Sequence, residues 1–269
     1  MENQALFSKR NFFFEYLEHT DSKKTEIHYH KCYEIYYLAK GKCRYFIDKK
    51  SYLLTAGDLA LIPRGVIHKT NYESENHSRF LINCSPAFIP PSVLKHFAAH
   101  PHIVRSEEQN AELREDFLAI QREYRSPDEF SEDEVRSLLA RILLTVIREA
   151  KVASPLQDEV GIAEKAVSYI HGHYSESVSL KEAARLCYVS PEHLSRTFKR
   201  ETGFGFNEYL NIYRLQRADT LLKEKSHLKI SEIALSCGFT DSNYFSKQYK
   251  RIYHVSPTEG RKRKEEGDV

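Results

Sequence analysis

The carboxy-terminal part of this 269-residue chain contains one pattern twice, and this repeat constrains the fold more than any other feature. Leu180–Cys187 aligns with Ile230–Cys237 at an offset of 50 residues, and Leu194–Arg200 aligns with Phe245–Arg251 at an offset of 51. Each copy predicts a short helix, a tight turn and a second helix, and the one-residue difference falls in the turn. The repeat therefore predicts an all-helical domain that contains two helix-turn-helix units.

Capping residues support both copies. Ser179 precedes the first helix of the first copy, and Ser190 followed by Pro191 precedes the second helix. Serine at such a position accepts a hydrogen bond from a free backbone N–H at the start of the helix. Proline lacks a backbone N–H, but at the first helical position that N–H would have no partner within the helix, so no hydrogen bond is lost. In the second copy we expect Gly238 to take a left-handed turn conformation and Thr240 to cap the second helix.

The second helix of each copy has apolar residues four positions apart, which lie on one side of the helix and should pack against the core. Its opposite side is polar and basic and should be exposed. The residues on these faces are Glu192, Ser195, Arg196 and Lys199 in the first copy, and Ser242, Asn243, Ser246, Lys247 and Lys250 in the second. Arg and Asn can recognise guanine and adenine in the major groove, and Lys and Ser can bind phosphates. Residues 160–269 also carry a net charge of +4, against −2 for the rest. Any exposed helix has a polar face, but two such faces on the basic part of the chain favour double-stranded DNA as a partner.

Residues from about Val160 to Pro257 resemble the DNA-binding domain of AraC/XylS-type transcriptional regulators. The matching residues run from Leu180 to Gly203 and from Ile230 to Lys250, and end in Ser256-Pro257. The resemblance implies that a long helix, about 207–223, joins the two units, so that their second helices enter two successive major grooves. It also implies a transcription activator that contacts RNA polymerase and acts as a homodimer.

Two residues near the end of this region depart from the family pattern. His254 stands where a glycine is usual before the Ser-Pro pair, and we expect it to strain the closing turn. Gly260 stands where an aromatic residue usually precedes the basic residue, here Arg261.

The amino-terminal part has a different periodicity. From about Phe12 to Cys84, short alternating segments rich in Tyr, Ile, Phe and Leu are separated by turn residues, which predicts the strands of a sandwich or barrel. From about Glu107 onward the apolar residues recur at helical spacing, and a second helix at about 134–150 has a wide apolar face. That face should pack on its own domain or form the seam of a dimer.

Two segments of the amino-terminal part resemble the half-motifs of cupin barrels: His28-x-His30-x3-Glu34-x6-Gly41 and Gly57-x5-Pro63-x-Gly65-x2-His68. In metal-binding cupins, the matching residues His28, His30, Glu34 and His68 would hold one divalent metal, and such a set suits several transition metals. AraC-type relatives often bind an organic effector in this barrel instead. These four residues and Tyr36 would then contact the effector, for which the resemblance implies a carbohydrate, because sugar metabolism is the commonest theme of the family. A purely structural role for them is the third alternative.

Together these features predict a two-domain α+β protein. We expect a cupin-like effector-binding β-barrel with an amino-terminal arm at 1–105 and a helical dimerisation or linker region at 106–153. We expect the double helix-turn-helix DNA-binding domain at 160–269, with its two units at about 179–201 and 230–252.

The leading functional hypothesis is a transcription regulator whose DNA binding or polymerase contact is controlled by a small molecule in the barrel, with the arm Met1–Lys9 as a lid by analogy. The alternatives are a metal or redox sensor that uses the His/Glu cluster, and a metallocupin enzyme fused to a DNA-binding domain. The chain lacks the G-x-S-x-G, P-loop and H-E-x-x-H motifs, so we expect no enzyme, no catalytic residues and no required cofactor. Five scattered cysteines without a C-x-x-C, and no apolar run of about 18 residues, favour a cytoplasmic protein with reduced thiols and no membrane contact.

Overall fold

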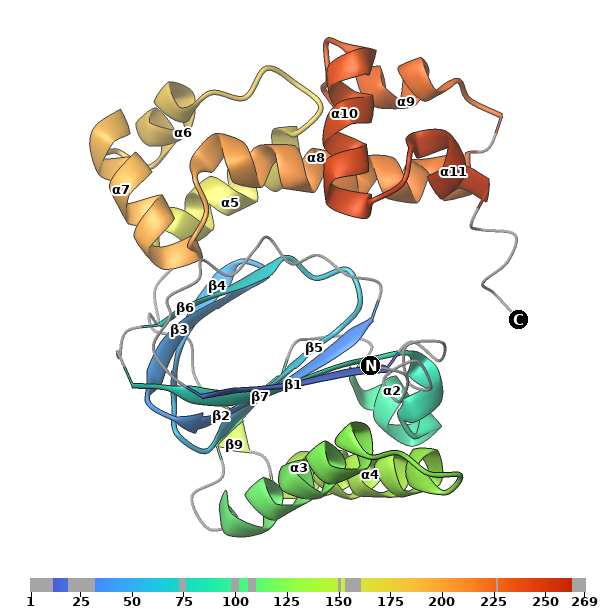
Figure 1. Ribbon diagram of the computed structural model, residues 1–269. Coiled ribbons are helices and arrows are strands. Elements are labelled where there is room, and N and C mark those ends of the chain that lie inside the picture. Colours follow the sequence, from blue (N-terminus) through green and yellow to red (C-terminus); the bar gives the residue numbers. More distant parts are fainter. Residues whose placement is uncertain are drawn as a thin grey trace. The chain divides into compact units, whose positions relative to one another are not determined.

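The computed structural model describes residues 12–18, 32–72, 76–97, 102–105, 110–149, 151–152, 161–225 and 227–262. The chain divides into two compact units, Met1–Asp158 and Glu159–Val269. The first unit combines β-sheets with helices and the second consists of helices, which confirms the predicted two-domain α+β class (Figure 1). No disulfide joins any of the five cysteines in the structure.

The first unit contains two antiparallel sheets with a shared core between them. Its strands are β1 (Phe12–Glu18), β2 (Tyr33–Lys40), β3 (Lys42–Ile47), β4 (Lys50–Thr55), β5 (Asp58–Ile62), β6 (His68–Tyr72), β7 (Ser78–Cys84), β8 (His102–Arg105) and β9 (Lys151–Val152). The larger sheet has the order β1-β7-β2-β5-β8-β9, and the smaller has the order β4-β3-β6. Because β9 pairs with β8, the segment that follows the helices of this unit returns to the larger sheet.

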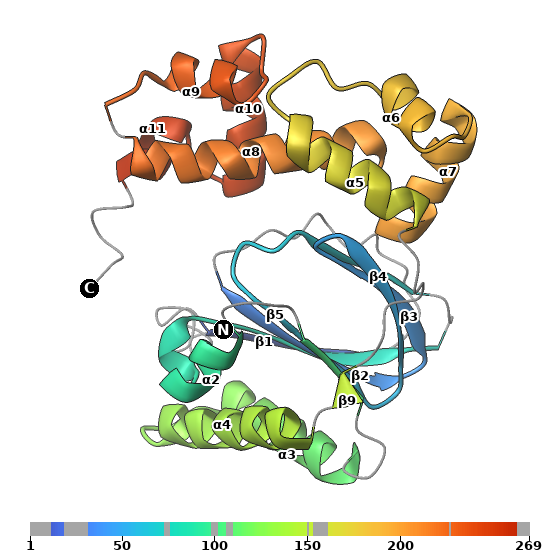
Figure 2. The ribbon, with the colours of Figure 1, turned by 180° about the vertical axis from the view of Figure 1, so that it is seen from behind.

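Alternation along the strands gives the larger sheet two buried faces. In β2, Tyr36 and Leu38 belong to the core between the two sheets, whereas Ile35 and Tyr37 belong to a second core against the helices. The helical layer consists of the short 3-10 helix η1 (Pro86–Phe88), α2 (Pro91–Phe97), α3 (Asn110–Arg125) and α4 (Ser131–Glu149). Figures 1 and 2 show α3 and α4 on the outer face of the larger sheet.

The apolar stripe of α4 packs within its own unit, which is one of the two expected uses of that face. Val135, Leu139, Ile142 and Leu143 are fully buried in the core that α3 and α4 share with the sheet. The ring of Phe117 on α3 stacks on strand residue Tyr37 with a centroid distance of 5.0 Å. These side chains are therefore covered by the chain itself and leave no apolar stripe on α4 for a second subunit.

The second unit is built around one long helix. Its helices are α5 (Ile162–His173), α6 (Leu180–Leu186), α7 (Pro191–Thr202), α8 (Phe206–Glu224), α9 (Ile230–Ser236), α10 (Ser242–Tyr253) and α11 (Pro257–Lys262). Helices α6 and α7 form one helix-turn-helix and α9 and α10 form the other, with α8 running between them (Figure 1). The resemblance placed the joining helix at about 207–223, within the observed α8.

Three of the expected structural signals in these modules are observed, and one is wrong. The Ser179 side chain accepts from the Glu182 N–H, and the Ser190 side chain accepts from the His193 N–H, each at 3.2 Å. Gly238 has a φ of +85°. Thr240 does not cap α10. The cap is the next residue, Asp241, whose carboxylate accepts from the N–H groups at the start of the helix at 2.7 and 3.2 Å. Asp is among the strongest N-caps, and here it outcompetes the neighbouring Thr.

Arg214 on α8 joins three segments of the second unit. Its Nε and Nη2 donate to the carbonyls of Tyr174 and Glu176, just after α5, at 2.7 Å each. Its guanidinium also lies 6.0 Å from the ring centre of Phe239, in the turn of the second module. In the same turn, a Cβ on Gly238 would lie 2.5 Å from the Tyr174 carbonyl oxygen. A glycine is therefore needed here for two reasons, the positive φ and the close approach of backbone.

The two departures from the family pattern have visible consequences. His254 caps α10 in the left-handed conformation, with a φ of +58°, which is the strain expected of a side chain at this position. Gly260 lies against Tyr249, and a Cβ there would lie 2.4 Å from the tyrosine hydroxyl oxygen. That hydroxyl donates to the buried carboxylate of Asp219 on α8 at 2.5 Å. An aromatic side chain at position 260 would displace this hydrogen bond.

The turns of the two modules differ at one equivalent position, which leads to a prediction. Tyr188 of the first module has a φ of +57° and is 95% exposed, and its counterpart in the second module is Gly238. We expect Tyr188→Gly to stabilise the domain by about 1 kcal/mol, because it removes left-handed strain without removing a buried contact. We expect Gly238→Ala to destabilise it by at least about 2 kcal/mol, because the methyl group meets the Tyr174 carbonyl.

The measurement is urea denaturation of the full chain, followed by circular dichroism at a wavelength dominated by helix. Wild-type protein and the two variants are compared at constant salt and pH. If both substitutions changed the free energy of unfolding in the same direction, the account of these two turns would be wrong.

Candidate functional site

Helix α7 presents the four residues predicted to face DNA in the first module. Its apolar residues Leu194 and Phe198 are fully buried, which fixes the rotation of the helix. All four predicted residues, Glu192, Ser195, Arg196 and Lys199, are exposed. The side chains are therefore available to a partner that approaches this face of the helix.

Glu192 has a local role at the start of α7. Hydrogen bonds from its own backbone N–H and from the Ser190 hydroxyl lower the pKa of its carboxyl group. A carboxylate in the first turn also interacts favourably with the positive end of the helix dipole. In contact with DNA, such a carboxylate would be repelled by phosphates but can accept a hydrogen bond from cytosine N4.

Helix α10 is oriented in the same way as α7, by burial of Phe245 and Tyr249. Ser242, Asn243, Lys247 and Lys250 are exposed. Ser246, the fifth predicted residue of this helix, is half-buried, and its hydroxyl donates to the Ser242 carbonyl at 2.9 Å. Its hydroxyl proton is therefore used within the helix.

The sequence did not single out all exposed groups beside these faces. Arg200 on α7 is exposed but has a carboxylate neighbour, Glu201, at 3.1 Å. Tyr244 on α10 is 43% exposed, and its hydroxyl accepts from the Asn211 amide of α8 at 3.4 Å. Tyr244 had been expected only as part of the family match, and its position at the apolar edge of the helix gave no separate signal.

The predicted barrel residues are only partly covered by the structure. His28 and His30 lie outside the described residues, as does the arm Met1–Lys9. Glu34 on β2 and His68 on β6 are both 3% exposed, and Glu34 Oε2 lies 3.4 Å from His68 Nε2. Two strands from different sheets thus bring these side chains together, although they are 34 positions apart in the sequence.

Tyr45 on β3 connects Glu34 to Tyr36, the remaining predicted residue. Its hydroxyl donates to Glu34 Oε1 at 2.5 Å. Its ring centre lies 5.1 Å from that of Tyr36, which is 1% exposed. The three predicted residues within the described chain therefore belong to one buried polar cluster, and Tyr45 is a member that the sequence analysis missed. The cross-strand position of Tyr45 cannot be obtained from the spacing along one strand.

The protonation of His68 follows from its two neighbours. Its Nδ1 lies 2.8 Å from the Val66 carbonyl, which can only accept, so Nδ1 carries a proton and Nε2 is directed toward Glu34. Burial alone would lower the pKa of His68, but the Glu34 carboxylate and the Val66 carbonyl together raise it above its ordinary value. A protonated Nε2 pairs with Glu34 and has no lone pair for a metal.

The same pair also has the chemistry of two metal ligands. An imidazole whose Nδ1 is held by a carbonyl commonly offers Nε2 to a metal, and a nearby carboxylate can be a second ligand. Among the described residues, however, no group of three or more His, Cys, Asp or Glu side chains could hold an ion. A metal site built on this pair would therefore need at least one further ligand from outside the described part of the chain.

Arg79 on β7 is a buried charged residue that the sequence analysis missed. It is 8% exposed, and its Nη2 donates to the Glu15 carboxylate on β1 at 2.6 Å. Its guanidinium carbon lies 5.9 Å from the ring centre of Tyr36. A signal was present in the sequence, because Arg79 lies two positions before Leu81 and so shares the inward face of an otherwise apolar strand.

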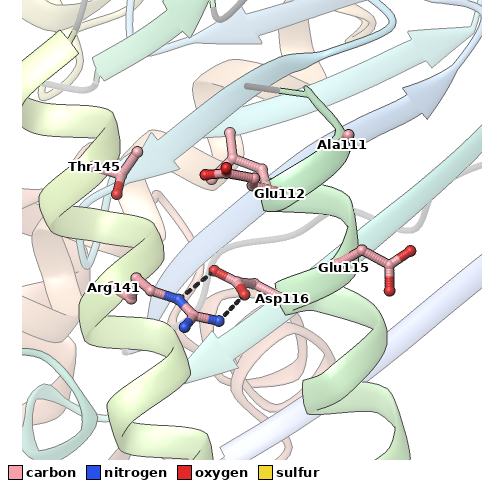
Figure 3. Close-up of a pocket in the computed structure, with 7 residues that line it drawn as sticks. Ala111, Glu112, Glu115, Asp116, Arg141 and Thr145 are labelled. Atoms are coloured by element: carbon pink, nitrogen blue, oxygen red, sulfur yellow. Dashed lines mark hydrogen bonds and ion pairs between the residues drawn. The ribbon is translucent and has the colours of Figure 1, made fainter. Parts of the chain in front are cut away.

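The helical layer of the first unit has a surface hollow of about 480 Å³ between α3 and α4 (Figure 3). Glu112, Glu115, Asp116 and Arg141 are among the residues that line it. Arg141 binds Asp116 through two hydrogen bonds, one of them from Nε at 2.9 Å. The hollow is open and charged, and it was not predicted from the sequence.

Comparison with known proteins assigns each unit to a family. Residues 13–144 match the model of the AraC-like ligand binding domain, and residues 183–263 match a helix-turn-helix domain. The chain is 24% identical over 241 residues to the HTH-type transcriptional activator RhaS of Escherichia coli (strain SE11), which covers 86% of this chain and 85% of that protein. It is 24% identical over 242 residues to the activator RhaR of Mannheimia succiniciproducens, which covers 88% of this chain and 87% of that one.

A shorter match has higher identity. The uncharacterized HTH-type transcriptional regulator YijO of Escherichia coli (strain K12) is 36% identical over 127 residues, which is 47% of this chain and 41% of that protein. In the described part of the chain, no helix is long and apolar enough to cross a membrane.

The two matched family models follow one another along the chain in the same order as the two structural units. This chain therefore belongs to the AraC type of transcriptional regulators, with a ligand-binding domain followed by a helix-turn-helix domain.

Proposed function

We propose that the chain is a transcription activator that places α7 and α10 in two successive major grooves of double-stranded DNA. The observation that carries this proposal is the duplication of an exposed polar and basic helix face on the two sides of α8. Arg196 and Asn243 are the candidates for base recognition, since their side chains can form paired hydrogen bonds with guanine and adenine. Lys199, Lys247 and Lys250 are the candidates for phosphate contacts.

The barrel is proposed to sense a small molecule and to carry no enzymatic activity. Its buried polar cluster of Glu34, Tyr36, Tyr45 and His68 offers both donors and acceptors, which suits recognition of a polar organic effector such as a carbohydrate. An effector controls the DNA-binding unit only if it binds one arrangement of the chain more tightly than another. Through that difference the effector would change DNA affinity or the contact with RNA polymerase in the cytoplasm.

A homodimer is part of the same proposal. The apolar stripe of α4 is covered, so the partner would use the outer surface of α3 and α4 or the barrel. The hollow at Arg141 supports the first choice, because it carries both signs of charge, and a two-fold interface requires a surface that is complementary to itself.

The test of DNA recognition is selection of binding sites from random double-stranded DNA by the purified full chain. We expect an enriched site with two blocks whose centres are about 10 base pairs apart. Arg196→Ala should relax the preference in one block only, and Asn243→Ala in the other only, each at a cost of about 1–3 kcal/mol for the best site. Lys250→Ala is the matched control, and it should weaken all sites to a similar degree. A single block, or loss of preference in the same block for both variants, would contradict the proposal.

A second test addresses the metal alternative. We propose that the barrel needs no divalent metal, because Glu34 and His68 neutralise one another and Tyr45 binds the remaining carboxylate oxygen. Treatment of the full chain with a chelator should leave its melting temperature unchanged, as should later addition of Zn²⁺. His68→Gln provides the control for the site. A melting temperature that falls with chelator, recovers with Zn²⁺ and loses both effects in His68→Gln would establish the metal sensor instead.

A further inference from the structure

The buried guanidinium of Arg79 has hydrogen-bond donors that the described part of the chain does not use. Nη2 donates to Glu15, but Nε and Nη1 are buried and have no acceptor among the described residues. A buried donor without an acceptor is unfavourable, and most such donors in folded proteins are paired. The guanidinium therefore marks a position where further acceptor oxygens, such as those of a ligand, can be bound.

The direction of Arg79 places this position inside the barrel. Strand β7 pairs with β2 on one side and with β1 on the other, and Arg79 lies opposite Leu38 and Leu17. Leu38 and Leu81, which share its face of the sheet, belong to the core between the two sheets. The unused donors therefore lie within the domain that matches the AraC-like ligand binding family.

A tyrosine pair lies next to the guanidinium and adds a further donor. The Tyr36 hydroxyl donates to the Tyr72 hydroxyl at 3.4 Å, so the proton of Tyr72 is directed to another acceptor. Burial lowers the pKa of Arg79, but the nearby Tyr72 and Glu15 raise it more, so the guanidinium stays charged. Arg79 and Tyr72 thus form a neighbourhood of donors around one permanent positive charge.

The other charged side chains inside the barrel do not neutralise the charge of Arg79 fully, so it can still attract an anion. Glu34 has its own partners in Tyr45 and His68. Glu15 is bound to Arg79, but its side chain is 40% exposed, so water weakens that pair. An anionic oxygen would satisfy both the donors and the charge of Arg79, whereas a neutral hydroxyl would satisfy only the donors.

We propose that the effector of this barrel carries an anionic group, a carboxylate or a phosphate, that binds Arg79. The inference rests on the proposed function of the barrel as a sensor, and it names the chemical class of the sensed molecule. It differs from a simple carbohydrate effector in one testable property, which is the need for a negative charge.

The experiment measures the melting temperature of the full chain at constant pH and ionic strength. Acetate or phosphate replaces chloride in the buffer, and the neutral acetamide is added to the chloride buffer. Acetamide has the shape of acetate without its charge and is the matched control ligand. We expect a saturable rise with acetate or phosphate and none with acetamide. A rise with acetate alone indicates a carboxylate, and a rise with phosphate alone indicates a phosphate ester.

Variants of Arg79 assign the effect to the site. Arg79→Met keeps most of the volume and removes the charge, and it should weaken the apparent affinity for the active anion by at least about 10-fold. Arg79→Lys keeps a charge and serves as the second variant should the first fail to fold; we expect it to weaken the affinity less. Arg251→Met, which removes an exposed arginine of the second unit, should bind the anion as wild type does.

The proposal is overturned if neither anion stabilises the wild type in a saturable way, if acetamide acts as acetate does, or if Arg79→Met keeps the wild-type affinity. These outcomes are separable from failure of the proposed function, because DNA-site selection by the same wild-type preparation reports on the second unit alone. Normal site selection without an anion effect would leave the regulator and remove the anionic effector.

Discussion

The position of Arg214 is the constraint on which the DNA-binding unit depends. One guanidinium on α8 holds two carbonyls that follow α5 and also lies over an aromatic ring in the turn of the second module. The same turn approaches the Tyr174 carbonyl so closely that only glycine fits at position 238. The loop before the first module and the turn inside the second are therefore fixed to one helix. A rigid connection of this kind is what two recognition helices need in order to meet one face of a DNA duplex in register.

The ligand-binding unit differs from the DNA-binding unit in that its core contains buried charged side chains. Glu34, His68 and Arg79 are each less than one-tenth exposed and lie among aromatic and aliphatic side chains. Buried ion pairs contribute little net stability, because desolvation of the charges offsets their attraction. Apolar side chains of similar volume at these positions would give a core of equal or greater stability. Under the proposal made above, the charge of Arg79 is retained to bind a ligand, whereas Glu34 and His68 pair with each other. The tyrosines around them provide both packing and hydrogen bonds.

Sequence analysis was most successful where the signal is local or repeated. The repeat predicted both helix-turn-helix modules, and the spacing of Leu194 and Phe198 predicted which face of α7 is exposed. It failed at Thr240, because two adjacent residues were both good caps and only backbone geometry decides between them. It also missed Tyr45 and Arg79. Tyr45 reaches Glu34 from the next strand along the chain, which belongs to the other sheet, and no single-strand pattern contains that pairing. The place of Arg79 on the inward face of an apolar strand was a signal, but its partner Glu15 is 64 positions away.

The most direct test of the account is the affinity of the chain for DNA sites in which only the spacing between the two recognised blocks is changed. If α8 and Arg214 hold the modules rigidly, affinity should be highest at one spacing, with block centres about 10 base pairs apart. Two added base pairs rotate the second block by about a fifth of a turn and should weaken binding by at least about 10-fold. Equal affinity at all spacings would contradict the account, because it would mean that the two modules bind DNA independently.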